Sequence, residues 1–152
     1  IILCCNISVK QKSATVSIFS SKFNIVSYHN DCQPWFIKTE QDFSNVLEDD
    51  PEVLKWLRPA SNQFNIYWSN GSKKYEPDFV VETADAIYMV ETKAKKNMQD
   101  ADVLGKKKAA EEYCKNASEF TKTVGGKPWK YVLLAHDTVD RAASFKYLTA
   151  LG

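Results

Sequence analysis

The sequence predicts an α/β protein with a mixed β-sheet flanked by helices on both faces. Two observations lead to this prediction. Segments with strand character alternate with segments of helical periodicity, an order that is typical of a sheet covered by helices. The segment WKYVLLAH (129–136) is also continuously apolar, which is typical of a strand in the interior of a sheet.

The N-terminal half is expected to hold two strands and then two helices. Apolar and polar residues alternate over 14–28, and this pattern predicts two short strands. Thr39 can cap a helix, because Asp42 follows three residues later. Pro51 predicts the start of a second short helix, since proline is tolerated at the first helical position, and Pro59 would end it.

The C-terminal half is expected to hold a three-strand meander, a helix, a strand and a last helix. The segment FNIYW (64–68) predicts the first strand of the meander, and the turn signal SNGSKK ends it. The remaining elements are expected at about 78–82 and 86–92 for the other strands of the meander, 100–117 for the long helix, 129–136 for the next strand and 137–151 for the last helix.

Length and composition indicate a single domain, 1–152, that can bury a core without metal or disulfide support. Of its residues 44% are hydrophobic and 26% are charged, which is ordinary for a soluble globular protein. No apolar run approaches the roughly 18 residues of a membrane span. The first residue is not Met, and no signal-peptide pattern follows it. We therefore expect a cytoplasmic protein and a fragment of a longer chain.

The four cysteines do not indicate a zinc site, because they show no C-x-x-C spacing and no nearby His pair. Reduced cysteines suit the cytosol. The net charge of +1 gives no argument for nucleic acid. Between Lys93 and Lys108, however, there are six Lys and two Asp. This excess is either an electrostatic footprint for nucleic acid or a solvated helix face.

The segment YEPDFVVETADAIYMVETK (75–93) places three charged residues in two runs that otherwise look like buried strands. Glu91 and Lys93 project from the same face, because side chains alternate along a strand. If residues 84–85 form a two-residue loop, or if the loop has four residues, Asp78 lies directly opposite Glu91. An odd loop without a bulge would not give this pairing.

Two opposed carboxylates require a cation between them or a proton on one of them. At about 5 Å and an effective dielectric near 20 they repel by about 3 kcal/mol. Mg²⁺ binds one or two carboxylates, with waters and substrate phosphate completing its shell. Asp78 and Glu91 are therefore expected to bind a divalent ion, and Lys93 can steady an attacking water or a developing negative charge. The alternative is a solvated edge-strand salt bridge between Lys93 and an acid.

The long helix adds a lysine on the side that faces the sheet. At about 100° per residue, Lys106 falls inside the apolar stripe that contains Val103, Ala110 and Cys114, whereas Lys108 faces solvent. A lysine in that position either binds an anion, such as a carboxylate or a phosphate, or extends along its stem to solvent.

These motifs resemble the PD-(D/E)xK nuclease superfamily, with Asp78 in PDF and with Glu91 and Lys93 in ETK. The longer segments YEPDFVVET, YMVETKAK, DVLGKKKAAEEYC and GGKPWKYVLLAHD are similar to the C-terminal endonuclease domain of type III restriction enzyme Res subunits, and EDDPEVLKWLRP also fits. The resemblance covers most of the chain. It implies a restriction-endonuclease-like core over 36–152, preceded by a strand-rich part over 1–35.

The resemblance also implies roles for individual residues. Asp78 and Glu91 would bind Mg²⁺, with the carbonyl of Thr92 as a further ligand, and Lys93 would position the nucleophilic water. Glu40 matches best the acid that many family members place near the metal from their first helix.

Asp42 and Glu48 match this first-helix acid less well, and a capping role is the competing explanation for these acids. His136, in the HD at a strand end, is expected to be structural rather than catalytic. Contacts to DNA phosphates are expected from four lysines: Lys95, Lys96, Lys106 and Lys107.

The activity that the resemblance implies is that of a type III site-specific deoxyribonuclease, whose Mg²⁺-dependent endonuclease domain cuts double-stranded DNA and accepts Mn²⁺ as a substitute. No base-reading helix is evident, so target recognition is expected from a methyltransferase (modification) subunit. No G-x-x-x-x-G-K-[ST] loop is present, so ATP would act only through an upstream motor outside this chain. The alternative is a catalytically silent nuclease-like domain that docks DNA or a partner subunit.

Overall fold

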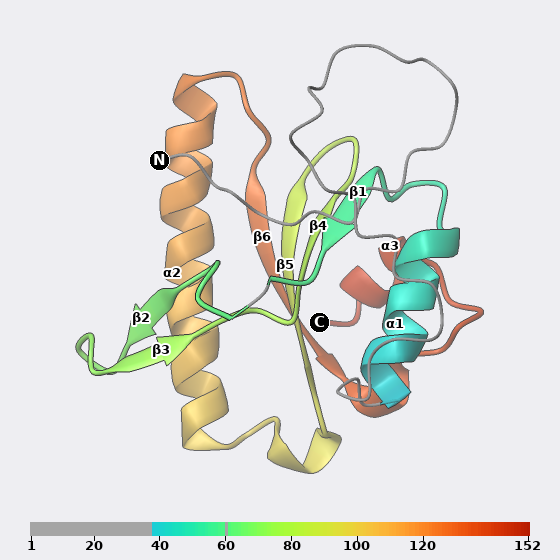
Figure 1. The fold of residues 1–152 in the computed structure, drawn as a ribbon, viewed down its shortest axis with the longest axis horizontal. Helices are drawn as coiled ribbons and strands as arrows, with labels where there is room; N and C mark the ends of the chain where they lie inside the picture. Colours follow the sequence, from blue (N-terminus) through green and yellow to red (C-terminus); the bar gives the residue numbers. More distant parts are fainter. Residues whose placement is uncertain (1–37, 60) are drawn as a thin grey trace.

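The computed structural model describes residues 38–59 and 61–152, and its central feature is a four-stranded sheet (Figure 1). The strands lie in the order β1-β4-β5-β6, with β1 and β5 antiparallel to β4 and with β6 parallel to β5. Their bounds are Lys55–Leu57 for β1, Phe79–Glu82 for β4, Ile87–Lys93 for β5 and Trp129–Ala135 for β6. The predicted mixed sheet is therefore confirmed. The strands expected over 14–28, and the strand-rich part over 1–35, lie outside the described residues.

Helices cover both faces of this sheet, as predicted. Helix α1 (Lys38–Asp49) and the short α3 (Phe145–Thr149) lie on one face, and α2 (Ala101–Thr123) lies on the other (Figure 1). Because side chains alternate along a strand, the same strands supply residues to both faces. The face under α1, which we call the apolar face, buries one continuous cluster: Phe43, Val46, Leu47, Val53, Phe79, Val81, Val90, Val132, Leu134, Phe145 and Leu148. No helix in the described part of the chain is long and apolar enough to span a membrane.

A separate two-stranded hairpin packs on α2. It consists of β2 (Ile66–Trp68) and β3 (Lys73–Tyr75), which are antiparallel. Gly105 allows the close approach, because a β-carbon at that position would lie 2.7 Å from the Trp68 ring. The face of the sheet under α2, which we call the α2 face, shares a second cluster with this hairpin: Phe64, Ile66, Tyr75, Val80, Met89, Ala110 and Cys114.

The predicted three-strand meander is wrong, because the strand within 64–68 does not join the two later strands. Residues 69–71 all adopt positive φ, of 52°, 55° and 81°. Asn and Gly are the residue types that tolerate this region best, so the chain reverses here at once. The strand then pairs with residues 73–75, which the sequence did not predict as a strand. The two later strands themselves are confirmed.

The predicted helix over 51–59 is also wrong, since this segment contains β1. Trp56 pairs with Val81 of β4, so the open edge of the sheet overrides a helical pattern. Thr39 is not an N-cap either, because it lies inside α1, whose described part begins at Lys38.

Helix α2 continues past Ala117, where it was predicted to end, and reaches Thr123. Ser118 accounts for part of this extension. Its hydroxyl donates to the Cys114 carbonyl at 2.7 Å and accepts from the Trp129 N–H at 2.8 Å. The added turns are therefore tied to the start of β6.

Two further expectations for the C-terminal part are wrong. Among residues 38–59 and 61–152, β6 pairs only with β5, so it lies at an edge there rather than in the interior. The helix expected over 137–151 is reduced to the 3₁₀ turn η2 (His136–Thr138) and α3. Asp50 fixes the start of α3, since its Oδ2 accepts from the Phe145 N–H at 2.7 Å.

Lys127 joins the loop before β6 to the turn between β4 and β5. Its Nζ donates to Glu82 Oε1 at 2.7 Å and to the Thr83 carbonyl at 2.6 Å. The Thr83 N–H donates to the Ala86 carbonyl at 2.9 Å, so the two-residue loop over 84–85 forms as predicted.

Candidate metal centre

Asp78, Glu91 and Lys93 meet at one end of the β4–β5 pair. Asp78 directly precedes β4, and the other two residues lie at the end of β5. One further step in the observed antiparallel register sets Asp78 opposite Glu91, as predicted. Glu91 and Lys93 belong to the α2 face, because Met89 of the same strand is buried there. Asp78 lies just outside β4, and its charge acts on both of them.

Glu91 is almost completely buried, with 4% of its surface exposed. Its Oε1 pairs with Lys93 Nζ at 2.6 Å, but its Oε2 has no hydrogen-bond partner among the described residues. Burial raises the pKa of Glu91, and the charge of Asp78 raises it further, while Lys93 opposes both effects. A buried carboxylate beside a second acid requires either a cation near it or a proton on one of the two acids.

Thr92 orients the Asp78 side chain. Asp78 Oδ2 accepts from the Thr92 N–H at 2.8 Å and from the Thr92 hydroxyl at 3.1 Å. Thr92 is only 3% exposed, so water competes little for these bonds. The resemblance implied that the Thr92 carbonyl is a metal ligand, and it did not imply a hydrogen bond from the Thr92 hydroxyl to Asp78. The threonine between Glu91 and Lys93 was the only indication of this hydrogen bond in the sequence.

Lys93 is held as an ammonium ion. Burial acts to lower its pKa, but the hydrogen bond and charge of Glu91, with the charges of Asp78 and Glu40, raise the pKa above its ordinary value of 10.5. Because Lys93 stays protonated near neutral pH, it can donate hydrogen bonds and stabilise negative charge, but it does not serve as a base.

Among the three first-helix acids, Glu40 is the one whose charge acts on Lys93. It is 8% exposed, and its Oε2 accepts from Arg58 Nη1 at 2.6 Å. No sequence pattern pointed to Arg58 at this site. The other two acids have partners elsewhere in the fold: Asp42 lies 3.9 Å from Arg141, and Glu48 accepts from Trp56 Nε1 at 3.0 Å.

The lysines that were expected to contact DNA lie in two groups. Lys95 and Lys96 are exposed in the 3₁₀ turn η1 (Lys95–Asn97), directly after β5. On α2, Lys106 is half-buried over the Tyr75 ring, 5.9 Å from its centroid. Two of the four make surface ion pairs: Lys95 with Asp137 at 3.1 Å and Lys107 with Glu111 at 3.9 Å. Lys108 is exposed, as predicted.

Two tyrosines that the sequence did not single out line the centre, Tyr75 from β3 and Tyr131 from β6. Burial raises the pKa of both, and the charge of Glu91 adds to this, so both hydroxyls stay neutral. The Tyr75 hydroxyl interacts with the Glu91 carboxylate, yet within the described residues it has no partner of good hydrogen-bond geometry. The parallel register of β5 and β6 places Tyr131 here. Leu133 pairs with Glu91, and Tyr131 lies two residues before Leu133 and therefore on the same face.

The donor set fits a hard divalent ion. Such ions prefer carboxylate oxygens, and Mg²⁺ needs only one or two of them from the protein. In the described part of the chain, no group of three or more His, Cys, Asp or Glu side chains is placed to hold a metal. Asp78 and Glu91 would therefore be joined by backbone carbonyl, water or substrate oxygens in a complete coordination shell.

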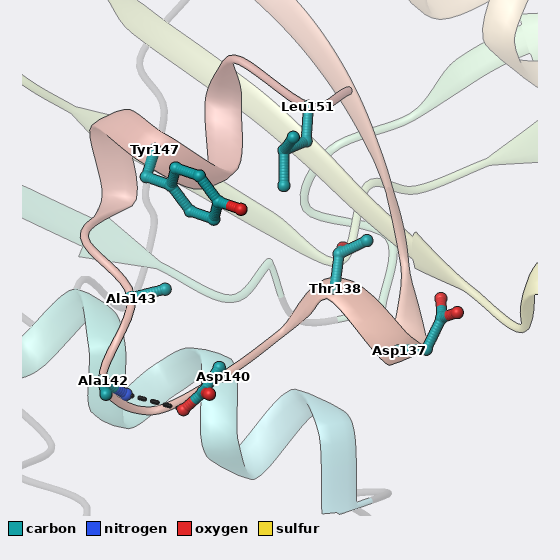
Figure 2. A pocket seen from close by; sticks show the side chains of 7 residues that line it. All are labelled: Asp137, Thr138, Asp140, Ala142, Ala143, Tyr147 and Leu151. Atoms are coloured by element: carbon teal, nitrogen blue, oxygen red, sulfur yellow. Dashed lines mark hydrogen bonds between the residues drawn. The ribbon is translucent and has the colours of Figure 1, made fainter.

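A surface pocket of about 500 Å³ lies beyond the end of β6 and does not include these residues (Figure 2). Asp137 and Asp140 line it together with Tyr147 and Leu151, and Asp140 accepts from the Ala142 N–H at 2.9 Å. Carboxylates repel phosphate, so this pocket does not extend a phosphate-binding surface.

His136 is half-buried at the start of η2, directly after β6. Its expected structural role stays a prediction.

Comparison with known proteins gave no counterpart, since no family model, curated protein or solved structure matches the chain. Function has to be inferred from the site itself.

Proposed function

We propose that this chain is a Mg²⁺-dependent endonuclease domain with a restriction-endonuclease-like core, similar to that of the Res subunits of type III restriction enzymes. The observation that carries the proposal is the nearness of two acids, Asp78 and buried Glu91, to the Lys93 cation, which lies 2.6 Å from Glu91. A structural salt bridge needs one acid for one lysine, whereas Asp78 adds a second acid beside Lys93 here. Glu40 also acts on Lys93, but it has its own cation in Arg58.

The residues of the chain would divide the work of phosphodiester hydrolysis. A divalent ion at this site would polarise the phosphate and lower the pKa of a bound water. Asp78, oriented by Thr92, and Glu91 would hold that ion through their carboxylate oxygens. Lys93, which is protonated, would hold the attacking water and stabilise negative charge on the phosphate.

DNA binding and partners belong to the same proposal. Lys95 and Lys96 of η1 and Lys106 and Lys107 of α2 would contact phosphates of double-stranded DNA without reading its sequence. A methyltransferase subunit would supply target recognition, and an upstream motor would consume ATP in the cytoplasm. Mn²⁺ would replace Mg²⁺.

A catalytically silent nuclease-like domain that docks DNA or a subunit is the second candidate. The 2.6 Å pair of Glu91 and Lys93 favours it, because a lysine can neutralise a buried acid without a metal.

Calorimetric titration of the chain with Mn²⁺ separates the two candidates. A metal-dependent nuclease should show saturable binding that Asp78→Asn and Glu91→Gln abolish. Asp49→Asn is the matched control, since Asp49 is an exposed acid at the end of α1, and it should bind Mn²⁺ like the unsubstituted chain. Absence of saturable binding in the unsubstituted chain would favour the silent domain.

Cleavage by the full-length enzyme gives the second test. Asp78→Ala should abolish DNA cutting there while ATP hydrolysis and folding persist. Normal cutting by this variant would refute the assignment of Asp78.

A further inference from the structure

The β2–β3 hairpin has one face on α2 and one face turned away from it. Ile66 and Tyr75 pair with each other and are buried, and Trp68 packs on α2. Side chains alternate across a strand, so the paired residues Tyr67 and Lys74 lie on the opposite side. We call the side that carries Tyr67 and Lys74 the outer face of the hairpin. The opposite face of the hairpin packs on α2, so the outer face is held in a fixed position.

The outer face combines an exposed ring with positive charge. Tyr67 is 65% exposed. A single exposed apolar residue needs no explanation, but the surrounding stretch 61–76 also holds two Lys against one acid, Glu76, together with three Asn and three Ser. Positive charge with many hydrogen-bond donors suits a polyanion.

The ion pair of Lys74 can be exchanged for a phosphate. Lys74 Nζ lies 3.1 Å from Glu76, with side chains 36% and 24% exposed, and it donates to Asn62 Oδ1 at 2.5 Å. Ion pairs at the surface contribute about 0–1 kcal/mol, so replacement of the Glu76 contact by a phosphate is not costly. Lys73 lies on the α2 side of the hairpin, over the Trp68 ring, and is not part of the outer face.

The outer face is also close to the candidate metal centre. Lys74 and Asp78 are four residues apart in the chain, so their Cα atoms are separated by at most about 14 Å. One turn of B-DNA spans about 34 Å, and the hairpin extends past α2 in Figure 1. A duplex that places a phosphate at Asp78 is therefore long enough to reach the hairpin within the same turn.

We propose that the outer face of the β2–β3 hairpin is a contact surface for duplex DNA, with Lys74 on a phosphate and Tyr67 against the sugar–phosphate backbone. The inference rests on the proposed nuclease function and adds a DNA-contacting element to the four lysines proposed above, which do not include Lys122. B-DNA admits a two-stranded ribbon at its major groove. Contacts to the backbone position the duplex and do not select its sequence.

Binding without cleavage tests this surface. Fluorescence anisotropy of a labelled random-sequence duplex, about three helical turns long, is measured for the chain in EDTA at several salt concentrations. Lys74→Gln should weaken binding about threefold and reduce the slope of log K against log salt by about 0.9. The double variant Tyr67→Ser/Lys74→Gln should weaken binding about tenfold.

The matched control is Tyr147→Ser/Lys122→Gln, which removes an exposed tyrosine of α3 and an exposed lysine at the end of α2. It should change binding by less than about twofold. Because Tyr67 and Lys74 are on the surface, thermal unfolding of the hairpin variants should match that of the unsubstituted chain. Lys74→Glu is a second variant at the same position, and charge reversal should weaken binding more than Lys74→Gln does.

The outcomes distinguish this inference from the proposed function. If the unsubstituted chain binds the duplex and the hairpin variants bind equally well, the hairpin surface is refuted and the nuclease proposal stands. If the unsubstituted chain binds no duplex at any salt concentration, both are refuted. If the variants lose affinity only for single-stranded DNA, the assignment of a duplex to this face is wrong.

Discussion

The two faces of the sheet differ in what the same strands bury. From β5, Tyr88 and Val90 join the apolar face, while Met89, Glu91 and Lys93 belong to the α2 face. The apolar face is a continuous layer of aliphatic and aromatic side chains. The α2 face is also apolar along most of β5, but at the C-terminal end of this strand it carries the charged residues Glu91 and Lys93.

This difference places the charged candidate site at the end of one face, away from the continuous apolar cluster of the other. Burial of apolar surface stabilises the fold wherever it occurs. The charged end of the α2 face acts in the other direction, since burial and the charge of Asp78 both disfavour ionised Glu91. Buried, mutually repelling acids contribute little to the free energy of unfolding, and such groups are typical of functional sites.

Phe43→Ala should cause the largest loss of stability, about 3–5 kcal/mol. Phe43 is fully buried in the apolar face, where its ring lies 5.1 Å from that of Phe79. Urea unfolding measures the loss. Phe120→Ala is the control, because Phe120 is 68% exposed, and its effect should stay within about 0.5 kcal/mol. Equal losses in the two variants would contradict the role of the apolar face.

Lys93→Met should destabilise the α2 face by about 2–3 kcal/mol, because Glu91 would then be buried without its cation. The raised pKa of Lys93 gives the pH dependence: its stabilisation is fully present below 10.5 and is lost as the pH rises above that value. The difference in unfolding free energy between the two proteins should therefore be constant from neutral pH to about 10 and then shrink. A difference that grows in alkali would exclude this pair.

Glu91 should make the metal-free protein less stable as the pH rises. Its pKa is raised in the folded state, so its stabilising contribution is present below the ordinary value of 4.5 and is lost as the pH rises through the folded pKa. Mn²⁺ at about 100 times its Kd should add about 2.7 kcal/mol at neutral pH. Thermal unfolding with and without Mn²⁺ checks both effects, and Glu91→Gln should lack both.

Gly105→Ala should destabilise the contact between the hairpin and α2 by about 1–2 kcal/mol. A new methyl group would overlap the Trp68 ring, and the higher helix propensity of alanine offsets only about 1 kcal/mol of this. Trp68→Leu removes the obstacle, so Gly105→Ala should be neutral or stabilising in that background. A loss of the same size in both backgrounds would mean that the ring is not the cause.

Thr92→Val should have the smallest effect on stability, about 0.5–1.5 kcal/mol, since it removes one hydrogen bond to Asp78 and keeps the volume of the side chain. Mn²⁺ affinity, measured by calorimetry, should fall severalfold because Asp78 is less well oriented. The control Thr123→Val removes a hydroxyl that donates to the Phe120 carbonyl in an exposed position, and it should leave Mn²⁺ affinity unchanged.

The pairing of β4 with β5 could be predicted because it depends only on local rules. A two-residue loop over 84–85 leaves one register, and alternation then sets Asp78 and Glu91 on one side. The side of α2 that carries Lys106 and Cys114 followed from helical periodicity in the same way.

The parts that could not be predicted depend on distant partners. The segment 51–59 has helix signals, yet its residues 55–57 form a strand because β4 offers an unpaired edge. Arg58 reaches Glu40 across 18 residues of sequence, and Tyr75 approaches Glu91 only because its hairpin packs on α2. No local pattern encodes such contacts.

Lys127 has a consequence for the candidate metal centre although it lies at the other end of the β4–β5 pair. Strands that slip by one residue turn every side chain to the opposite side of the sheet, and such a slip would separate Asp78 from Glu91. Lys127 donates hydrogen bonds to both Glu82 and the Thr83 carbonyl, and these two acceptors hold these positions only in the native register of β4 and β5. Lys127 thus stabilises the register of β4 and β5 from a surface loop, and this register determines whether Asp78 and Glu91 are close enough to share an ion.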